Sequence, residues 1–221
     1  MYEVYYAIVL SICAIYGVIL HWFKRKKKKH NRFKFHRFYL VGPMDRDREG
    51  GKVWRDDLSD FIRSHNGIPL NPYEKPLLEE FGKEAKEDDL HFAKIVEAAK
   101  KKDYDRVSEL VKILRHSDLR LVDSADVVVV NLDLDKNPCG SYEELFTSNR
   151  QKKPIIVKSS VPKSEIPFWL FGTLPHSLFF ETWDEVKEYL RHMDEDDEVD
   201  LLGRWVFFDL EDEIKRISRS S

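Results

Sequence analysis

The stretch Val127–Leu132 reads VVVVNL and decides the fold class. Four consecutive valines favour an extended chain, and the lack of apolar–polar alternation is typical of a parallel strand covered on both faces. The polar segment that follows, DLDKNPCGS (133–141), contains the proline and glycine expected of a turn. We therefore expect Val127–Leu132 to be the central strand of a parallel sheet.

Apolar segments on either side of this strand supply the other expected elements. Glycine, proline and asparagine interrupt them, and stretches with helical spacing of apolar residues lie between them. Further strands are expected at Phe38–Val41, Ile68–Asn71, Pro154–Lys158 and Leu178–Phe180. Helices are expected from about Val53 to Asn66, from Tyr142 to Arg150 and from Trp183 to His192. Strands that alternate with helices predict an α/β fold with a doubly wound, five-stranded parallel sheet of the Rossmann or flavodoxin type.

The charged region 77–116 is expected to be a helical insertion, either a lid or a packing face, and not a separate domain. Its apolar residues recur at the spacing of buried helical stripes. These residues are Phe92, Ile95, Val96, Ala99, Val107, Leu110, Val111 and Leu114.

The carboxyl ends of the strands mark where a ligand is expected. In a doubly wound sheet this places the site at 42–51, 71–74 and 131–144. Glu144 lies about one turn into the helix that GSYEEL (140–145) opens, so it either projects into the site or, with Glu143, only stabilises the helix N-terminus. Asp126, directly before the central strand, is more simply a cap or turn residue. Cys139 lies beside the site, but no base that would activate it as a nucleophile is identifiable.

The N-terminal segment is expected to be a single transmembrane anchor (residues 1–23). Val4–Phe23 contains no charged side chain over 20 positions, enough for a helix to cross a hydrocarbon core of roughly 30 Å. A cleaved signal peptide is the alternative, but the basic residues follow the apolar run and no small-residue cleavage site follows. A basic linker (24–37), a catalytic-size domain (38–192) and an acidic linker with an apolar C-terminal segment (193–221) complete the expected organisation.

Charge is distributed unevenly along the chain. Nine of the 37 Lys and Arg residues lie within 24–37; the residues that follow contain 28 basic and 39 acidic residues, a net charge of −11. An acidic body argues against general nucleic-acid binding. The basic run beside the anchor favours anionic lipid headgroups over nucleic acid and predicts that the domain is cytoplasmic.

The sequence gives no indication of a metal or cofactor. It contains neither of the glycine-rich loops that bind nucleoside triphosphates or dinucleotides, and its histidines lack zinc-like spacing. Cys13 and Cys139 form no disulfide framework, which agrees with a reducing compartment.

Four motifs in a consistent order resemble the nucleoside 2-deoxyribosyltransferases and the related enzymes that hydrolyse nucleotide N-glycosidic bonds. They are YLVGPM after the first strand, LNPY after the second, DLRLVDSADVVVVNLD leading through the central strand and GSYEEL opening the next helix; KKPIIV follows. The resemblance covers roughly residues 38–180. It implies a nucleoside or nucleotide substrate and a homo-oligomer whose subunits share sites.

The resemblance also implies roles for single residues. Glu144 falls at the family's nucleophilic glutamate, which attacks the anomeric carbon and suits the step because a carboxylate is ionised near neutral pH. Asp118 falls at the aspartate that handles the nucleobase. The expected substrate-binding residues are Gly42, Pro43, Met44, Arg46, Arg48, Gly50, Gly51, Asn71, Tyr73, Asn131, Asp133, Gly140 and Ser141.

Three alternatives stay open at this point. The loop with Arg46, Arg48 and Lys52 resembles a 5′-phosphate loop and favours a nucleoside monophosphate N-glycosidase, but it equally fits a solvated surface loop. The family often has an aspartate six positions before the nucleophile, where this chain has Pro138, so a catalytically inactive, membrane-tethered nucleotide sensor is the second reading. The third reading is structural, with the anchor and the apolar segment 205–208 serving assembly; oligomerisation through this segment does not exclude catalysis.

Overall fold

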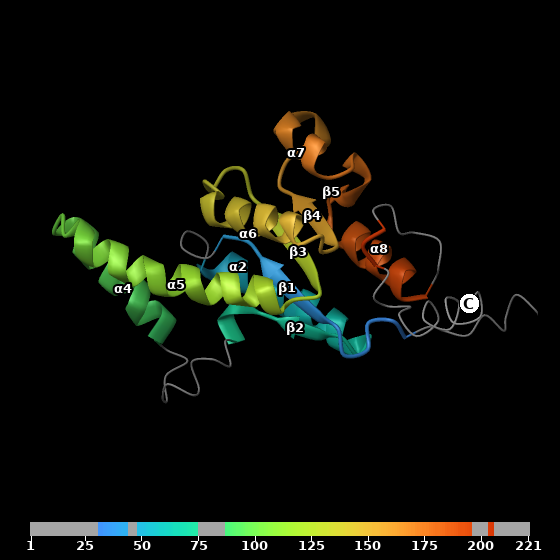
Figure 1. Ribbon diagram of the computed structural model, residues 1–221, viewed down its shortest axis with the longest axis horizontal. Helices are drawn as coiled ribbons and strands as arrows, with labels where there is room; N and C mark the ends of the chain where they lie inside the picture. The colour runs from blue at the N-terminus through green and yellow to red at the C-terminus, as the bar shows by residue number, and fades with distance from the viewer. Residues whose placement is uncertain (1–30, 44–47, 75–86, 196–202, 206–221) are drawn as a thin grey trace, which may run out of the picture. The chain divides into compact units, whose positions relative to one another are not determined.

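The structure, a computed structural model, describes residues 31–43, 48–74, 87–195 and 203–205, with the backbone alone for 48–50 and 87–92. Within these ranges the chain forms a five-stranded sheet in the order β2-β1-β3-β4-β5, and every neighbouring pair is parallel (Figure 1). The strands are β1 (Arg37–Val41), β2 (Ile68–Leu70), β3 (Val127–Leu132), β4 (Ile155–Ser159) and β5 (Phe179–Phe180). This is the flavodoxin-like order, and it confirms the predicted parallel α/β sheet.

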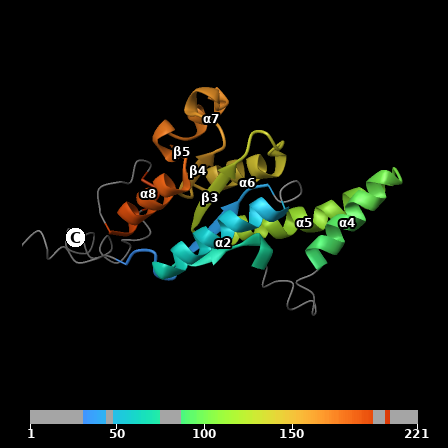
Figure 2. The same ribbon diagram turned by 180° about the vertical axis from the view of Figure 1, so that it is seen from behind.

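Helices connect the strands and cover both faces of the sheet. The α-helices are α2 (Arg48–Ser64), α4 (Glu87–Lys100), α5 (Tyr104–Ser124), α6 (Cys139–Arg150), α7 (Phe168–Thr173) and α8 (Trp183–Glu195). Three short 3-10 helices follow strands or loops: η1 (Pro72–Glu74), η2 (Lys163–Glu165) and η3 (His176–Leu178). Figure 1 views the sheet with α5 and α6 in front of it, and Figure 2 views it from behind, with α2 in front.

Side chains alternate along the strands between two apolar cores, one on each face. Phe38 and Leu40 of β1 pack in the core formed with α2 and α8. Tyr39 and Val41 pack in the other core, formed with α5, α6 and α7. The valines of β3 divide in the same way, which explains why this strand shows no alternation of polarity: both of its faces are buried.

The helical insertion differs from the prediction in its end and in its buried residues. Helix α5 continues through His116 to Ser124, so the helical region is longer than expected. Of the predicted stripe, Leu110 is buried, whereas Ala99 and Val111 are exposed. The reason is that α4 and the first half of α5 pack on each other and extend away from the sheet (Figure 1), while the second half of α5 reaches the core.

Segments from both ends of the described chain meet in one core. Phe33 is fully buried, its N–H donates to Asp194 Oδ1 at 3.0 Å, and its ring stacks on Trp205 at 6.3 Å between centroids. Two expectations are therefore corrected: the acidic run is not solvated at Asp194, and Trp205 packs inside its own chain instead of forming an exposed patch. Residues 206–208 of that patch lie outside the described residues, and oligomerisation stays a prediction.

The predicted membrane anchor at Val4–Phe23 also lies outside the described residues. Within the described ranges, no helix combines the length and the apolar character that a membrane crossing requires.

Candidate active site

Glu144 is a buried carboxylic acid in the second turn of α6, beyond the carboxyl end of β3. Glu144 is 9% exposed, and the phenol of Tyr39 donates a hydrogen bond to its Oε1 at 2.6 Å. Tyr39 lies in the middle of β1, on the face that α6 covers. The site therefore spans β1 and β3, the point at which the strand order of the sheet reverses and where ligands bind in doubly wound folds.

The surroundings of Glu144 make it a weak acid. Burial raises its pKa to about 8, and the charge of Asp118 raises it too, whereas the hydrogen bond from Tyr39 and the charge of Arg55 oppose the rise. Burial, and next the charge of Glu144, raise the pKa of Tyr39 well above its ordinary value, so the phenol remains the donor. Glu144 therefore holds its proton more strongly near neutral pH than an exposed glutamate does, whereas the resemblance led us to expect a carboxylate already ionised there.

Arg55, in the second turn of α2, is a site residue that the sequence analysis missed. It is fully buried, and it donates from Nε to Leu40 O (3.0 Å), from Nη1 to Gly51 O (2.8 Å) and from Nη2 to Gly42 O (2.7 Å). Its guanidinium lies over the ring of Trp54, 4.5 Å from the centroid. Burial lowers the pKa of Arg55. Its position in the sequence could have indicated its burial, because Arg55 falls on the apolar face of α2, three residues before Leu58.

Gly42 is the predicted binding residue at the end of β1, and its role is close packing. A Cβ on Gly42 would lie 2.9 Å from Cζ2 of Trp54 and 3.1 Å from Cβ of Asn131. A side chain at this position would therefore push apart β1, α2 and the end of β3. Asn131, another predicted binding residue, is half-buried at this junction.

The predicted phosphate loop is in part a helix. Because α2 already begins at Arg48, Gly50, Gly51 and Lys52 belong to its first turns and not to a loop. Gly51 again permits close approach, since its Cβ would lie 3.0 Å from the carbonyl oxygen of Pro43. The ammonium of Lys52 pairs with Asp56 one turn later, a local contact that does not require a phosphate. Met44 and Arg46 lie outside the described residues, and no side-chain position is described for Arg48.

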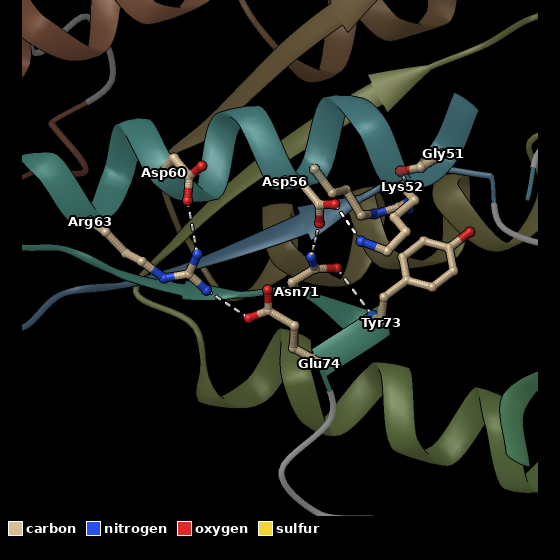
Figure 3. A network of polar contacts seen from close by, with 9 residues as sticks. Gly51, Lys52, Asp56, Asp60, Arg63, Asn71, Tyr73 and Glu74 are labelled. Carbon is tan, nitrogen blue, oxygen red and sulfur yellow. Dashed lines mark hydrogen bonds and ion pairs between the residues drawn. The ribbon is translucent and has the colours of Figure 1, made fainter. Parts of the chain in front are cut away.

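Asn71 and Tyr73 are brought beside α2 by the turn after β2 (Figure 3). Asn71 is buried; its Oδ1 accepts from the Tyr73 N–H at 3.0 Å and its Nδ2 lies 3.5 Å from Asp56 Oδ1. The Tyr73 ring consequently comes within 5.3 Å of the Arg55 guanidinium carbon. Asn71 thus shapes the turn, and Tyr73 is the residue of this pair that borders the site.

Asp118 is brought to the site by α5, because this helix runs on past the predicted end. Its charge acts on Glu144, Tyr39 and Arg55, so two carboxyl groups share one region of the protein. The neighbouring Glu143 is part-exposed and is held by the guanidinium of Arg115, with Nε 2.8 Å from Oε2. The two adjacent glutamates of α6 therefore have opposite surroundings.

Asp133, Gly140 and Ser141 are the remaining predicted binding residues. Asp133 makes contacts within its own loop, and the other two lie in the first turn of α6. Asp133 is engaged locally: its Oδ1 accepts from the Asp135 N–H at 3.1 Å and its Oδ2 lies 3.2 Å from the Lys136 ammonium. Gly140 is exposed with open space where a side chain would be, and Ser141 is buried.

Asp126 has a structural role, but it links two strands and is not the cap or turn residue that the sequence favoured. Its Oδ2 accepts from the Arg37 N–H at 2.8 Å, which joins the starts of β1 and β3 at the edge opposite Glu144. Within the described ranges, no group of three or more His, Cys, Asp and Glu side chains is placed to hold a metal ion.

The comparisons with known proteins find similarity among solved structures. No family model matches the chain, and no curated protein matches it. A 2-deoxyribosyltransferase from Bacillus psychrosaccharolyticus has 21% identity, with 69% of this chain and 91% of that chain covered and a TM-score of 0.47. A 2-deoxyribosyltransferase from Leishmania mexicana has 12% identity, with 71% and 97% covered and a TM-score of 0.46.

Proposed function

We propose that this chain is an enzyme that cleaves the N-glycosidic bond of a deoxynucleoside or its 5′-monophosphate, with Glu144 as the nucleophile. The observation that carries the proposal is the buried carboxyl of Glu144, held by the Tyr39 phenol at 2.6 Å and close enough to Asp118 for the two charges to interact. A pair of carboxyl groups in one site is what glycosidic bond cleavage with a covalent intermediate requires. The order of the four sequence motifs supports a nucleoside as the substrate.

The reaction uses each group in turn. A carboxylate oxygen of Glu144 attacks the anomeric carbon while the bond to the nucleobase breaks, and the bonding electron pair passes to the base nitrogen. Asp118 supplies a proton to the departing base. A second base or water then attacks the anomeric carbon of the glycosyl ester and gives its proton to Asp118, while the bond to Glu144 breaks and leaves its electron pair on the carboxylate; a second base gives transfer and water gives hydrolysis.

The raised pKa of Glu144 supports one alternative assignment for the same reaction. A carboxyl group that holds its proton at neutral pH is suited to protonate the leaving base, with Asp118 as the ionised partner. The pH dependence of kcat/KM separates the two roles. With Glu144 as the nucleophile, kcat/KM rises through about pH 8 because the ionised form reacts; with Glu144 as the acid, it falls through the same pH.

A catalytically inactive nucleotide sensor is the second candidate function. Pro138 occupies the position of the family's aspartate, and the nearby Asp133 is engaged with its own loop and Lys136. Without the family's aspartate, the site would make fewer polar contacts with a sugar. It would still have the Tyr73 ring beside a bound ligand. Binding of a nucleotide without any product would support this function.

Incubation of the full-length chain with deoxynucleosides and their monophosphates, with and without free acceptor bases, tests the proposal. We expect released or exchanged base in the chromatogram, and a loss of roughly 10³-fold or more in Glu144→Gln because the covalent route is removed. Glu143→Gln is the matched control: it changes the adjacent glutamate, which pairs with Arg115, and should retain activity within about tenfold. Absence of turnover in the folded wild-type chain would overturn the enzymatic proposal.

We further propose that the domain is held at the cytoplasmic face of a membrane by Val4–Phe23. The uncharged run of 20 residues and the basic residues that follow it support this placement. Carbonate extraction of membranes from cells that express the full chain tests it, because an anchored chain stays in the pellet whereas a peripheral one is released.

A further inference from the structure

Arg55 is the one basic side chain among the described residues that is fully buried. A buried cation is costly unless it is well hydrogen-bonded, and it is usually paired with a carboxylate. Here the three hydrogen bonds go instead to the main-chain carbonyls of Leu40, Gly42 and Gly51. These neutral partners satisfy donors of the guanidinium, and its positive charge interacts with the Glu144 and Asp118 carboxyl groups.

The three carbonyls define one corner of the fold. Leu40 and Gly42 lie at the end of β1, and Gly51 lies in the first turn of α2, so the guanidinium ties together the two ends of the β1–α2 connection. The corner is tightly packed, since a Cβ on Gly51 would lie 3.0 Å from Pro43 O. Leu40 directly follows Tyr39, the hydrogen-bond donor to Glu144. Displacement of this corner would therefore displace the phenol.

Four charged or titratable groups, each from a different element, act on the Glu144 carboxyl. Tyr39 comes from β1, Asp118 from α5 and Glu143 from α6 itself, and the fourth is Arg55 from α2. Among these four groups Arg55 alone is a cation. Its removal would leave Glu144 with two other carboxyl groups, whose charges oppose its ionisation, and with the hydrogen bond from the Tyr39 phenol as the one remaining group of the four that favours it.

We propose that Arg55 is a positioning residue of this site: its fork of hydrogen bonds holds the β1–α2 corner and thereby Tyr39, and its charge keeps Glu144 ionisable. The kinetic part of this proposal rests on the proposed function, and the electrostatic part does not. Lysine at this position would retain the charge but lose the planar fork, whereas methionine would lose both. The two substitutions therefore separate the two roles.

Carbon-13 NMR of full-length chain labelled at the glutamate carboxyl carbons tests the electrostatic part. The Glu144 signal is identified by its absence in Glu144→Gln, and its titration midpoint is measured in each variant. We expect the midpoint to rise by about one pH unit in Arg55→Met, which loses both the charge and the fork, and to rise by less in Arg55→Lys, which retains the charge. Arg63→Met is the matched control on the same helix, because Arg63 is exposed and pairs with Asp60 and Glu74 (Figure 3).

Kinetics test the positioning part. Both Arg55 variants are expected to lose about 10²-fold in kcat with a smaller change in KM, the size of effect that a shift of roughly 1 Å in a catalytic group produces. Arg55→Lys with full kcat would overturn the positioning role, and Arg55→Met with a wild-type midpoint would overturn the electrostatic role. The NMR titration needs no turnover, so an inactive wild-type chain would refute the proposed reaction without deciding the role of Arg55. If Arg55→Met fails to fold by circular dichroism, Arg55→Gln replaces it in the titration, since it too lacks the charge.

Discussion

Replacement of Glu144 by glutamine is expected to make the protein more resistant to unfolding at alkaline pH. The residue is 9% exposed, and the pKa of its carboxyl is about 8 in the folded chain against an ordinary value of 4.5. Glutamine has the same shape, and its amide oxygen can still accept the hydrogen bond from Tyr39. The substitution therefore removes the titration while it preserves the packing.

The sign of the effect follows from proton binding. Between pH 4.5 and about 8 the folded chain holds the proton of Glu144 while the unfolded chain has lost it, so the free energy of unfolding falls as the pH rises through this window. The slope in the middle of the window is about 1.4 kcal/mol per pH unit. Integrated from pH 5 to pH 9, the loss is about 4 kcal/mol, and the glutamine variant is spared it.

Chemical denaturation of wild type and Glu144→Gln at a series of pH values measures this difference. The variant's free energy of unfolding minus that of wild type should grow by about 4 kcal/mol from pH 5 to pH 9, because all other titrating groups are shared. Glu143→Gln should not show this rise, since the hydrogen bond from Arg115 lowers the pKa of Glu143. A difference that stays constant within about 1 kcal/mol would refute the argument that Glu144 is buried as an acid.

Three further substitutions test single contacts. Gly42→Ala should cost about 1–3 kcal/mol in thermal unfolding, because its Cβ would lie 2.9 Å from the Trp54 ring; an unchanged melting temperature would show that the corner can relax. Asp194→Ala should cost about 1–3 kcal/mol in denaturation and speed amide exchange at Phe33, whose buried N–H loses its acceptor; protected exchange would contradict this. Tyr39→Phe should raise the pKa of Glu144 further, because the hydrogen bond from the phenol lowers that pKa in wild type; the pH at which kcat/KM changes should rise with it. An unchanged pH profile would exclude the phenol as a group that tunes Glu144.

The sheet could be predicted because its central strand is buried on both faces. A parallel strand of this kind is apolar at every position, and Val127–Leu132 has the same bounds in the structure as in the prediction. The edge strand Ile68–Leu70 is shorter and only half-buried, so its pattern was weaker. Glu144 became a candidate for a related reason: the turn and helix that follow a central strand are readable. The choice between a site residue and a residue that only stabilises the helix came from the resemblance.

Arg55 and the helical insertion could not be predicted because contacts distant in the sequence decide them. An arginine in a helix is ordinarily solvated, and only carbonyls from β1 and the first turn of α2 make its burial tolerable. The apolar residues of α4 and α5 have helical spacing whether their partner is the sheet or another helix. Asp118 was identified through the resemblance, while its placement on the long α5 came only from the structure.

The side chains of β1 point alternately into two cores, so the composition of this site depends on which residues of that short strand face α6. Tyr39 faces α6 because side chains alternate along a strand and its two neighbours, Phe38 and Leu40, face α2. Deletion of one residue from the start of β1 would turn every following side chain over, and a leucine would then face the Glu144 carboxyl in place of the phenol. Lengthening of the α4–α5 hairpin, in contrast, would leave this alternation untouched. A change in length is thus tolerable far from the strand, whereas within the strand it would separate the phenol from the Glu144 carboxyl.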